Sequence, residues 1–252
     1  MKLLKNTSLA LLSTLIMSTQ SAVAEVLTDT QLHATLGVIT HFILDDNIIV
    51  HHGIRYETVT SPYTGKVWLD RNLGATQVCT NIDDTSCFGD YYQWGRGVDG
   101  HQNSTSNTTN TQSTDINNVG HGDFIAVSFN WASVDANGSA RSTNWSKIDA
   151  TSVCPSGFRV PTDVEVRAEL FDIGSAEITN STEAFDSFLK LPSNGYRNGA
   201  TGTMFIFGLS GTIWTSVASS TFHGTNIYFD SDLVGYSLVG RSDGRAVRCL
   251  RD

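Results

Sequence analysis

Four cysteines constrain the fold of this chain most, because they follow a segment with the pattern of an export signal and can therefore form disulfide bonds. They are Cys79, Cys87, Cys154 and Cys249. In an oxidising compartment an even number of cysteines favours disulfide bonds, here two, and three pairings are open. Zinc binding is the alternative. It is disfavoured because no two of these cysteines have C-x2-C spacing and no histidine lies close to any of them in the sequence.

The first 24 residues have the three parts of a signal peptide. Lys2 and Lys5 give a positive start, residues 9–17 form a short apolar stretch, and Ala22-Val23-Ala24 supplies the small residues of a cleavage site. The apolar stretch is too short to span a bilayer, and no later stretch reaches the roughly 20 apolar residues of a spanning helix. We therefore expect a secreted, periplasmic or cell-surface protein with no membrane-spanning segment after the signal peptide.

The chain is acidic, with a formal net charge of −9. Removal of residues 1–24 takes away two lysines and no acidic residue, which changes this charge from −9 to −11. The acidic balance argues against nucleic acid as a partner, and equally against an anionic membrane surface. Apolar residues make up 40% of the chain and charged residues only 16%, so we expect a loop-rich exported protein with a core of its own.

One helix start is clearly marked in the sequence. Thr162 and Glu165 have the spacing of a capping box, which predicts a helix that ends at Gly174. The stripe expected to face the core comprises Val164, Ala168 and Phe171, with Leu170 and Ile173 beside it. The acidic side chains expected on its solvent-exposed face are Glu165, Glu169 and Asp172. A second short helix is expected over residues 182–189.

The remaining segments are predicted to be strands and loops. The strands expected from their alternation and flanking turns are Arg55–Val59, Lys66–Leu69, Met204–Leu209, Thr212–Ser216, Asn226–Asp230, Tyr236–Val239 and Ala246–Leu250. Residues 102–118 contain one apolar side chain and are expected to form a surface loop. Residues 123–150 are expected to be loops with scattered core anchors, namely Phe124, Phe129, Trp131 and Trp145.

Two local patterns resemble binding motifs but have simpler interpretations. Residues 95–100 match G-x-G-x-x-G, yet a dinucleotide site needs a helix directly afterwards, and the polar residues 102–118 cannot supply one. We therefore interpret these glycines as loop formers. His51 and His52 form a histidine pair, but adjacent side chains of a strand point to opposite faces, so a shared metal is not expected.

An ordered series of short motifs runs through the last two thirds of the chain. They are GKVWLDRNLGA at 65–75, GDYYQWGR at 89–96, CPSGFRVPTDVE at 154–165, LPSNGYR at 191–197, Trp214, and AVRCLRD at 246–252. In this order the chain resembles the Fibrobacter succinogenes major paralogous domain family (FISUMP), a family of secreted modules related to the C-type lectin-like fold. The resemblance covers residues 56–252 and leaves residues 25–55 as an N-terminal extension.

The resemblance implies an α+β fold of the C-type lectin-like type, with two helices, small antiparallel sheets and long loops. It supports the pairing of Cys79 with Cys87 and of Cys154 with Cys249. In several proteins of this fold the segment before the last strand displays the ligand-binding surface, here Thr215–Arg245. With Trp214 just before it, the candidate ligand-binding residues are Phe222, His223, Asn226, Tyr228, Asp230, Asp232, Tyr236, Arg241 and Asp243. Ordinary turns and strand exteriors are the alternative interpretation of the same residues.

These observations predict a non-catalytic binding module that recognises a glycan or a protein on a surface. A structural or adhesive protein of the cell envelope is the alternative. Catalysis is least favoured, because the chain has no nucleophile or metalloprotease motif, and the related formylglycine-generating enzymes rely on free cysteines. Calcium is the one candidate cofactor. The acidic residues in loops do not have calcium-loop spacing, so no ligands are assigned among Asp83, Asp84, Asp90 and Asp99.

Overall fold

The computed structural model describes residues 48–252. The expected signal peptide, residues 1–24, and most of the expected extension, residues 25–55, lie outside this range. The described part begins with a hairpin of β1 (Ile49–His51) and β2 (Ile54–Tyr56), in which Ile49 pairs with Tyr56. His52 and Gly53, both with positive φ, make the turn between these two strands.

Beyond this hairpin, the described residues form three further antiparallel sheets and one short parallel pair. The first sheet contains, in spatial order, β3 (Thr58–Thr60), β4 (Val67–Leu69), β15 (Leu250–Arg251) and β8 (Phe158–Arg159). The second contains β10 (Met204–Phe205), β9 (Tyr196–Arg197), β14 (Gly244–Arg245) and β5 (Tyr92–Gln93). The parallel pair is β6 (Thr108–Thr109) with β7 (Phe124–Ile125).

The third sheet is the longest and follows the chain order. It consists of β11 (Gly211–Ser219), β12 (His223–Phe229) and β13 (Val234–Gly240). The predicted strands in this segment are therefore confirmed, although each is longer than expected. The predicted strand at Ala246–Leu250 forms only at its end, in β15, while Ala246 makes an isolated parallel bridge to Ile213.

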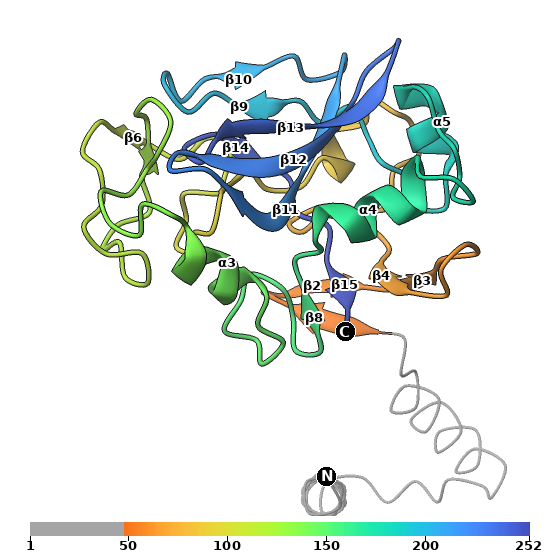
Figure 1. Cartoon of the computed structure of the whole chain (residues 1–252), viewed down its shortest axis with the longest axis horizontal. Helices are drawn as coiled ribbons and strands as arrows, with labels where there is room; N and C mark the ends of the chain where they lie inside the picture. Colours follow the sequence, from red (N-terminus) through yellow and green to blue (C-terminus); the bar gives the residue numbers. More distant parts are fainter. Residues whose placement is uncertain (1–47) are drawn as a thin grey trace, which may run out of the picture. The chain divides into compact units, whose positions relative to one another are not determined.

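Three α-helices are present in the described range, not the two expected. They are α3 (Ser139–Trp145), α4 (Asp163–Leu170) and α5 (Ser181–Asp186), and a 3-10 turn, η1, covers Thr85–Cys87. α4 and α5 correspond to the two predicted helices. α3 lies where loops were expected, in residues 123–150, and it packs beside β11 (Figure 1). The mixed α and β content confirms the α+β class.

The capping box of α4 is confirmed, but its buried face differs from the prediction. The Thr162 hydroxyl accepts from the backbone N–H of Glu165, and the Glu165 carboxylate accepts from the backbone N–H of Thr162 at 2.9 Å. The helix ends at Leu170, four residues before Gly174. Its buried side chains are Val166, Glu169 and Leu170, whereas Val164 is 57% exposed and Ile173 is fully exposed.

Glu169 is therefore a correction, because it was expected on a solvated face. Its carboxylate is fully buried and accepts hydrogen bonds from the hydroxyl of Ser61 and from Nε1 of Trp68 at 3.2 Å. These donors lie in the first sheet and its turn, so the glutamate connects α4 to the strands beneath it. A buried carboxylate is tolerated when hydrogen bonds replace its hydration, as they do here.

The third sheet separates two core clusters. On the face toward α4 the packed side chains are Ile213, Ile227 and Phe229, with Val166 and Leu170 of the helix. The opposite face packs Trp214 against a cluster that includes Trp94, Trp145, Val247 and Cys249. Both α3 and α4 contact this sheet (Figure 1), so its strands are held from two sides.

The two disulfide bonds of the predicted pairing are present. Cys79 is joined to Cys87 and Cys154 to Cys249, with Cα atoms 5.1 Å and 5.9 Å apart. The zinc alternative, which the sequence already disfavoured, is excluded because each sulfur atom is bonded to the sulfur of its partner cysteine. The second bond ties the segment before β8 to the residue before β15.

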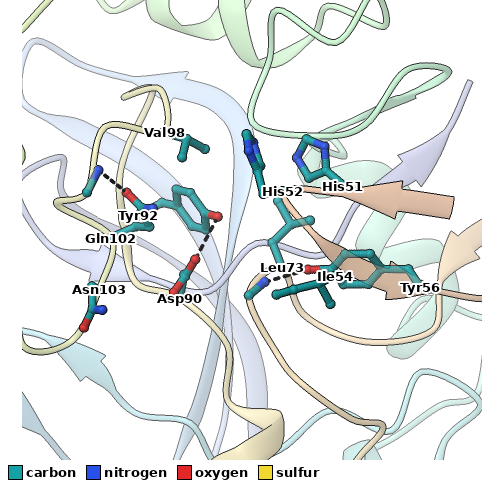
Figure 2. Close-up of a pocket in the computed structure, with 12 residues that line it drawn as sticks. His51, His52, Ile54, Tyr56, Leu73, Asp90, Tyr92, Val98, Gln102 and Asn103 are labelled. Atoms are coloured by element: carbon teal, nitrogen blue, oxygen red, sulfur yellow. Dashed lines mark hydrogen bonds between the residues drawn. The ribbon is translucent and has the colours of Figure 1, made fainter.

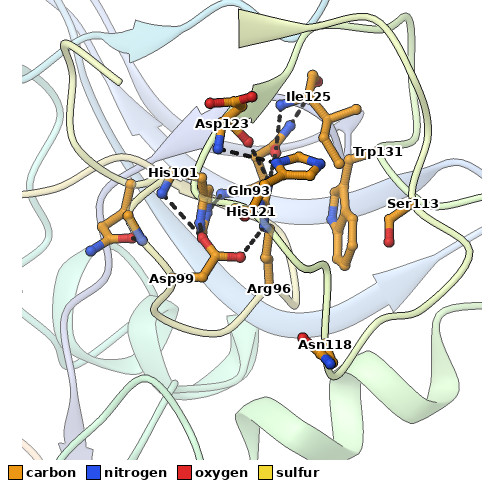
Figure 3. A network of polar contacts seen from close by, with 12 residues as sticks. Gln93, Arg96, Asp99, His101, Ser113, Asn118, His121, Asp123, Ile125 and Trp131 are labelled. Carbon is orange, nitrogen blue, oxygen red and sulfur yellow. Dashed lines mark hydrogen bonds and ion pairs between the residues drawn. The ribbon is translucent and has the colours of Figure 1, made fainter. Parts of the chain in front are cut away.

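A buried polar network fixes the glycine-rich segment at residues 95–100 (Figure 3). Arg96 donates to Asp99 at 2.8 Å and to the backbone carbonyls of His121 and Asp123 at 2.9 and 3.0 Å. His101 contacts the other oxygen of Asp99 at 2.7 Å. This segment is a braced loop with no helix after it, which supports its interpretation as a loop former.

Candidate functional site

The structure divides the ten candidate ligand-binding residues between the core and several surfaces. Trp214, Asn226 and Arg241 are buried, which corrects their assignment as ligand contacts. Trp214 donates its indole N–H to the carbonyl of Tyr92 at 2.7 Å, and Asn226 accepts from the hydroxyl of Ser237 at 2.7 Å. These three side chains build the scaffold, because their polar atoms are used inside the protein.

Three more candidates are acidic residues in turns. Asp230 accepts backbone N–H bonds from Asp232 and Leu233 at 2.9 and 3.0 Å, which closes the turn between β12 and β13. Asp243 pairs with Arg245 at 3.0 Å and accepts from the backbone of Gly199. Asp232 is exposed in the turn between β12 and β13. These acidic groups lie at different places and do not form one site.

The two tyrosines occupy opposite faces of the third sheet. Tyr236 pairs with Ile227, whose side chain faces α4, and it lies beneath the guanidinium of Arg167, 5.5 Å from the ring centre. Tyr228 is the neighbour of Ile227 along β12, so its side chain points the other way. A single ligand therefore cannot contact both tyrosines on one face of the sheet.

Phe222 and His223 meet a third aromatic side chain, Phe129, at the end of the sheet. The ring centres of Phe129 and Phe222 lie 6.3 Å apart, and those of Phe129 and His223 lie 6.1 Å apart. Phe129 is 59% exposed and Phe222 is 50% exposed. We call these three residues the aromatic surface. Exposed neighbouring rings mark candidate interaction sites, because soluble proteins rarely gather large apolar side chains at their surface.

Arg241 anchors the aromatic surface from below. Its guanidinium is fully buried and donates only to backbone carbonyls, on two loops. The acceptors are Ser220, Thr221 and His223 on one side, at 2.7 to 3.3 Å, and Ala136 and Asn137 on the other, at 2.8 and 3.1 Å. Burial lowers the pKa of Arg241 to about 10, which still leaves it charged at neutral pH. The guanidinium donates its hydrogen bonds to loop carbonyls and is not accessible to a ligand at the surface.

The backbone of Phe129 is held in an unusual conformation. Its φ is +70°, a left-handed value that costs a non-glycine residue about 1–2 kcal/mol. The carbonyl of Phe129 accepts from the backbone N–H of Ser242 at 3.2 Å. A Cβ atom on Gly240 would lie 3.0 Å from the Cα of Phe129, so the glycine makes room for this close approach. Strain of this kind occurs often at functional surfaces.

Phe129 is also a correction, because the sequence predicted it as a core anchor. Phe124, Trp131 and Trp145 are buried as expected, but Phe129 points outward. Its spacing from Phe222 in the sequence gives no sign that the two rings meet. Chemically, the aromatic surface offers flat apolar contact and one imidazole, a combination suited to binding.

The described part of the chain offers no evident place for a metal ion. Within residues 48–252, no three His, Cys, Asp or Glu side chains are arranged to hold one. Two of the acidic residues considered for calcium have other partners: Asp84 caps η1, and Asp99 pairs with Arg96 and His101. No helix in the same range is long and apolar enough to cross a bilayer.

Comparisons with known proteins provide no independent identification. No protein-family model, no curated protein and no solved structure matches the chain. The resemblance to the FISUMP family therefore rests on the motifs in the sequence. The functional assignment has to be argued from the geometry of the described residues.

Proposed function

We propose that this chain is an exported, non-catalytic binding module of the C-type lectin-like type that recognises a glycan through the aromatic surface. The observation that supports it most is the position of Phe129 and Phe222, which are exposed side by side. Buried Arg241 holds the turn that carries Phe222, and the backbone N–H of Ser242 holds the carbonyl of Phe129. A preorganised surface loses little conformational entropy on binding. The two disulfides are compatible with an oxidising compartment.

A glycan fits this surface because sugar rings have apolar C–H faces and polar edges. The aromatic side chains supply the apolar contact area. Around them lie exposed hydroxyl-bearing residues, namely Ser128, Ser220 and Thr221. His223 adds a ring nitrogen, and its Nδ1 lies 3.0 Å from the hydroxyl of Ser220. Such a rim can form hydrogen bonds with sugar hydroxyls.

The proposal is tested by screening the oxidised protein on a glycan array and on whole cells, with calcium and with a chelator. We expect Phe222→Ala and Phe129→Ala each to weaken glycan binding by about tenfold or more, because burial of a phenylalanine contributes about 1.5–3 kcal/mol. Phe205→Ala is the matched control, since Phe205 is 51% exposed and belongs to β10 in another sheet.

Loss of binding in Phe205→Ala, or full binding in both other variants, would reject the aromatic surface as the site. Absence of any glycan binding by folded protein would reject the glycan, and binding to cells that resists glycan removal would point to a protein partner. Binding that requires calcium would show that the site contains a metal ion, which the arrangement of the described residues does not indicate.

A structural or adhesive role is the second candidate, favoured by the free edge of the third sheet. β13 pairs with β12 and with no other strand of the described residues. Leu233, Tyr236 and Leu238 on or beside it are exposed. An uncovered edge strand with apolar side chains can pair with another strand. Concentration-dependent self-association in sedimentation, abolished by Leu238→Lys, would support this role.

A further inference from the structure

Two of the sequence motifs meet at a hollow that the aromatic surface does not involve. GKVWLDRNLGA contributes Leu73 and Gly74, and GDYYQWGR contributes Asp90 and Tyr92. The β1–β2 hairpin covers the other side with His51, His52 and Tyr56 (Figure 2). The hollow has a volume of about 330 Å³. This lies at the lower end of the range for ligand pockets, so only a small molecule fits.

The carboxylate of Asp90 is the main polar group of this hollow. It lies directly over Gly74, where an added Cβ atom would be only 2.4 Å from the Asp90 Cγ, so a glycine is required there. One carboxylate oxygen accepts from the hydroxyl of Tyr92 at 3.3 Å. No lysine or arginine within residues 48–252 forms an ion pair with Asp90.

This environment leaves the negative charge incompletely compensated. Burial raises the pKa of Asp90, and the hydrogen bond from Tyr92 and the nearby His52 offset this effect only in part. Burial also lowers the pKa of His51, which favours its neutral form. A carboxylate that is partly removed from water gains most from a positively charged partner. A cationic ligand would supply the charge that the protein itself does not place there.

The other parts of the hollow limit the kind of cation. The Gln102 carbonyl oxygen already accepts from the backbone of Gly100, and the Asn103 oxygen accepts from Thr105. Their NH2 groups remain as donors to a ligand oxygen. Tyr56, Leu73 and Val98 add aromatic and apolar walls. The ligand should thus combine an ammonium group with oxygen acceptors on a compact frame.

We propose that this hollow binds a small hydroxylated ammonium compound, of which an amino sugar is representative, with its ammonium group on Asp90 and its hydroxyl oxygens toward Gln102 and Asn103. The site is independent of the aromatic surface. The overall negative charge of the chain also attracts cations toward it.

The experiment is a calorimetric or NMR titration of the full oxidised chain at neutral pH with glucosamine, glucose and N-acetylglucosamine. We expect glucosamine to bind about tenfold or more tightly than the two uncharged sugars, because only it forms a charge-assisted hydrogen bond with Asp90. Asp90→Asn keeps the shape of the side chain and should remove this preference. Asp83→Asn, which removes one negative charge from an exposed loop residue, is the matched control.

A second variant keeps the proposal testable if the Asp90→Asn protein does not fold. Val98 lines the hollow and is 38% exposed, so Val98→Phe should narrow the site and weaken all binding without changing Asp90. Equal affinity for glucosamine and glucose, no glucosamine binding, or binding that survives both Asp90→Asn and Val98→Phe would each refute the proposal. The preference for glucosamine over glucose should persist in Phe222→Ala, because Asp90 and the hollow are not altered in that variant, and this separates the result from the test of the aromatic surface.

Discussion

His101 is a buried histidine whose two ring nitrogens have different partners. Its Nε2 accepts from the backbone N–H of Gln93 at 3.1 Å, so the ring proton lies on Nδ1, which donates to Asp99 at 2.7 Å. This assignment follows because a backbone N–H can only donate. A second proton on the ring would break the bond to Gln93 and charge a side chain with no exposed surface. The fold therefore requires the neutral form.

We expect acid to destabilise the protein through this residue. Burial lowers the pKa of His101 to about 4, whereas an imidazole in the unfolded chain titrates near 6.5. The unfolded chain takes up the proton first, so the stabilisation is complete above pH 6.5 and is lost as the pH falls to 4. The loss amounts to about 3 kcal/mol in the free energy of unfolding.

Urea denaturation at a series of pH values measures this dependence. His101→Gln, which cannot titrate, should make the curve less steep between pH 6.5 and 4, and the exposed His121→Gln is the matched control. An unaltered curve in His101→Gln would show that other groups cause the acid sensitivity. In the unaltered protein the pKa of Asp99 is lowered, partly by its contact with His101, so Asp99 itself titrates at more acidic pH than this window.

At the scale of elements, α4 offers two valines two positions apart with opposite environments. Val166 is fully buried in the core and Val164 is 57% exposed. We expect Val166→Ala to lower the free energy of unfolding by about 2 kcal/mol, and Val164→Ala to change it by less than about 0.5 kcal/mol. Chemical denaturation of both variants decides between this face and the one predicted from the sequence, which had placed Val164 in the core.

The difference between the predicted and observed α4 shows what the sequence contained. The capping box is a local interaction between Thr162 and Glu165, so it could be read directly. The buried face depends on which strands pack against the helix. Glu169 illustrates this, because its partners Ser61 and Trp68 lie about a hundred positions away in the sequence. Polarity alone therefore placed it on the wrong face.

α3 was missed for a related reason. Its sequence, SARSTNW, contains few strong helix formers, and Gly138 at its start has a left-handed backbone and no side-chain cap. The helix is held by tertiary contacts, since its Arg141 and Trp145 are buried. The candidate site also depends on tertiary contacts. Phe222 and His223 were expected at a surface, but their neighbour Phe129 belongs to a loop that is distant in the sequence, so its contact with them could not be predicted.

At the scale of the whole molecule, the two disulfides should contribute unequally to stability. The Cys154–Cys249 bond closes a loop of 95 residues, and Cys79–Cys87 closes one of 8. On the chain-entropy model these are worth about 4.5 and 2.5 kcal/mol. Paired alanine replacements, compared by thermal unfolding, should therefore lower the melting temperature more for the long loop. Equal losses, or a larger loss for the short loop, would contradict this model.

The buried arginines have a consequence for how this protein can change over time. Arg241 and Arg197 hold the loops through backbone carbonyls, at 2.7 to 3.3 Å, and each amino acid supplies the same carbonyl. Loops fastened in this way place no demand on the identity of their outward side chains. New residues at Thr221 or Ala136 could alter what the surface recognises while the frame stays intact. The molecule thus separates the part that evolution can vary freely from the part that it must keep.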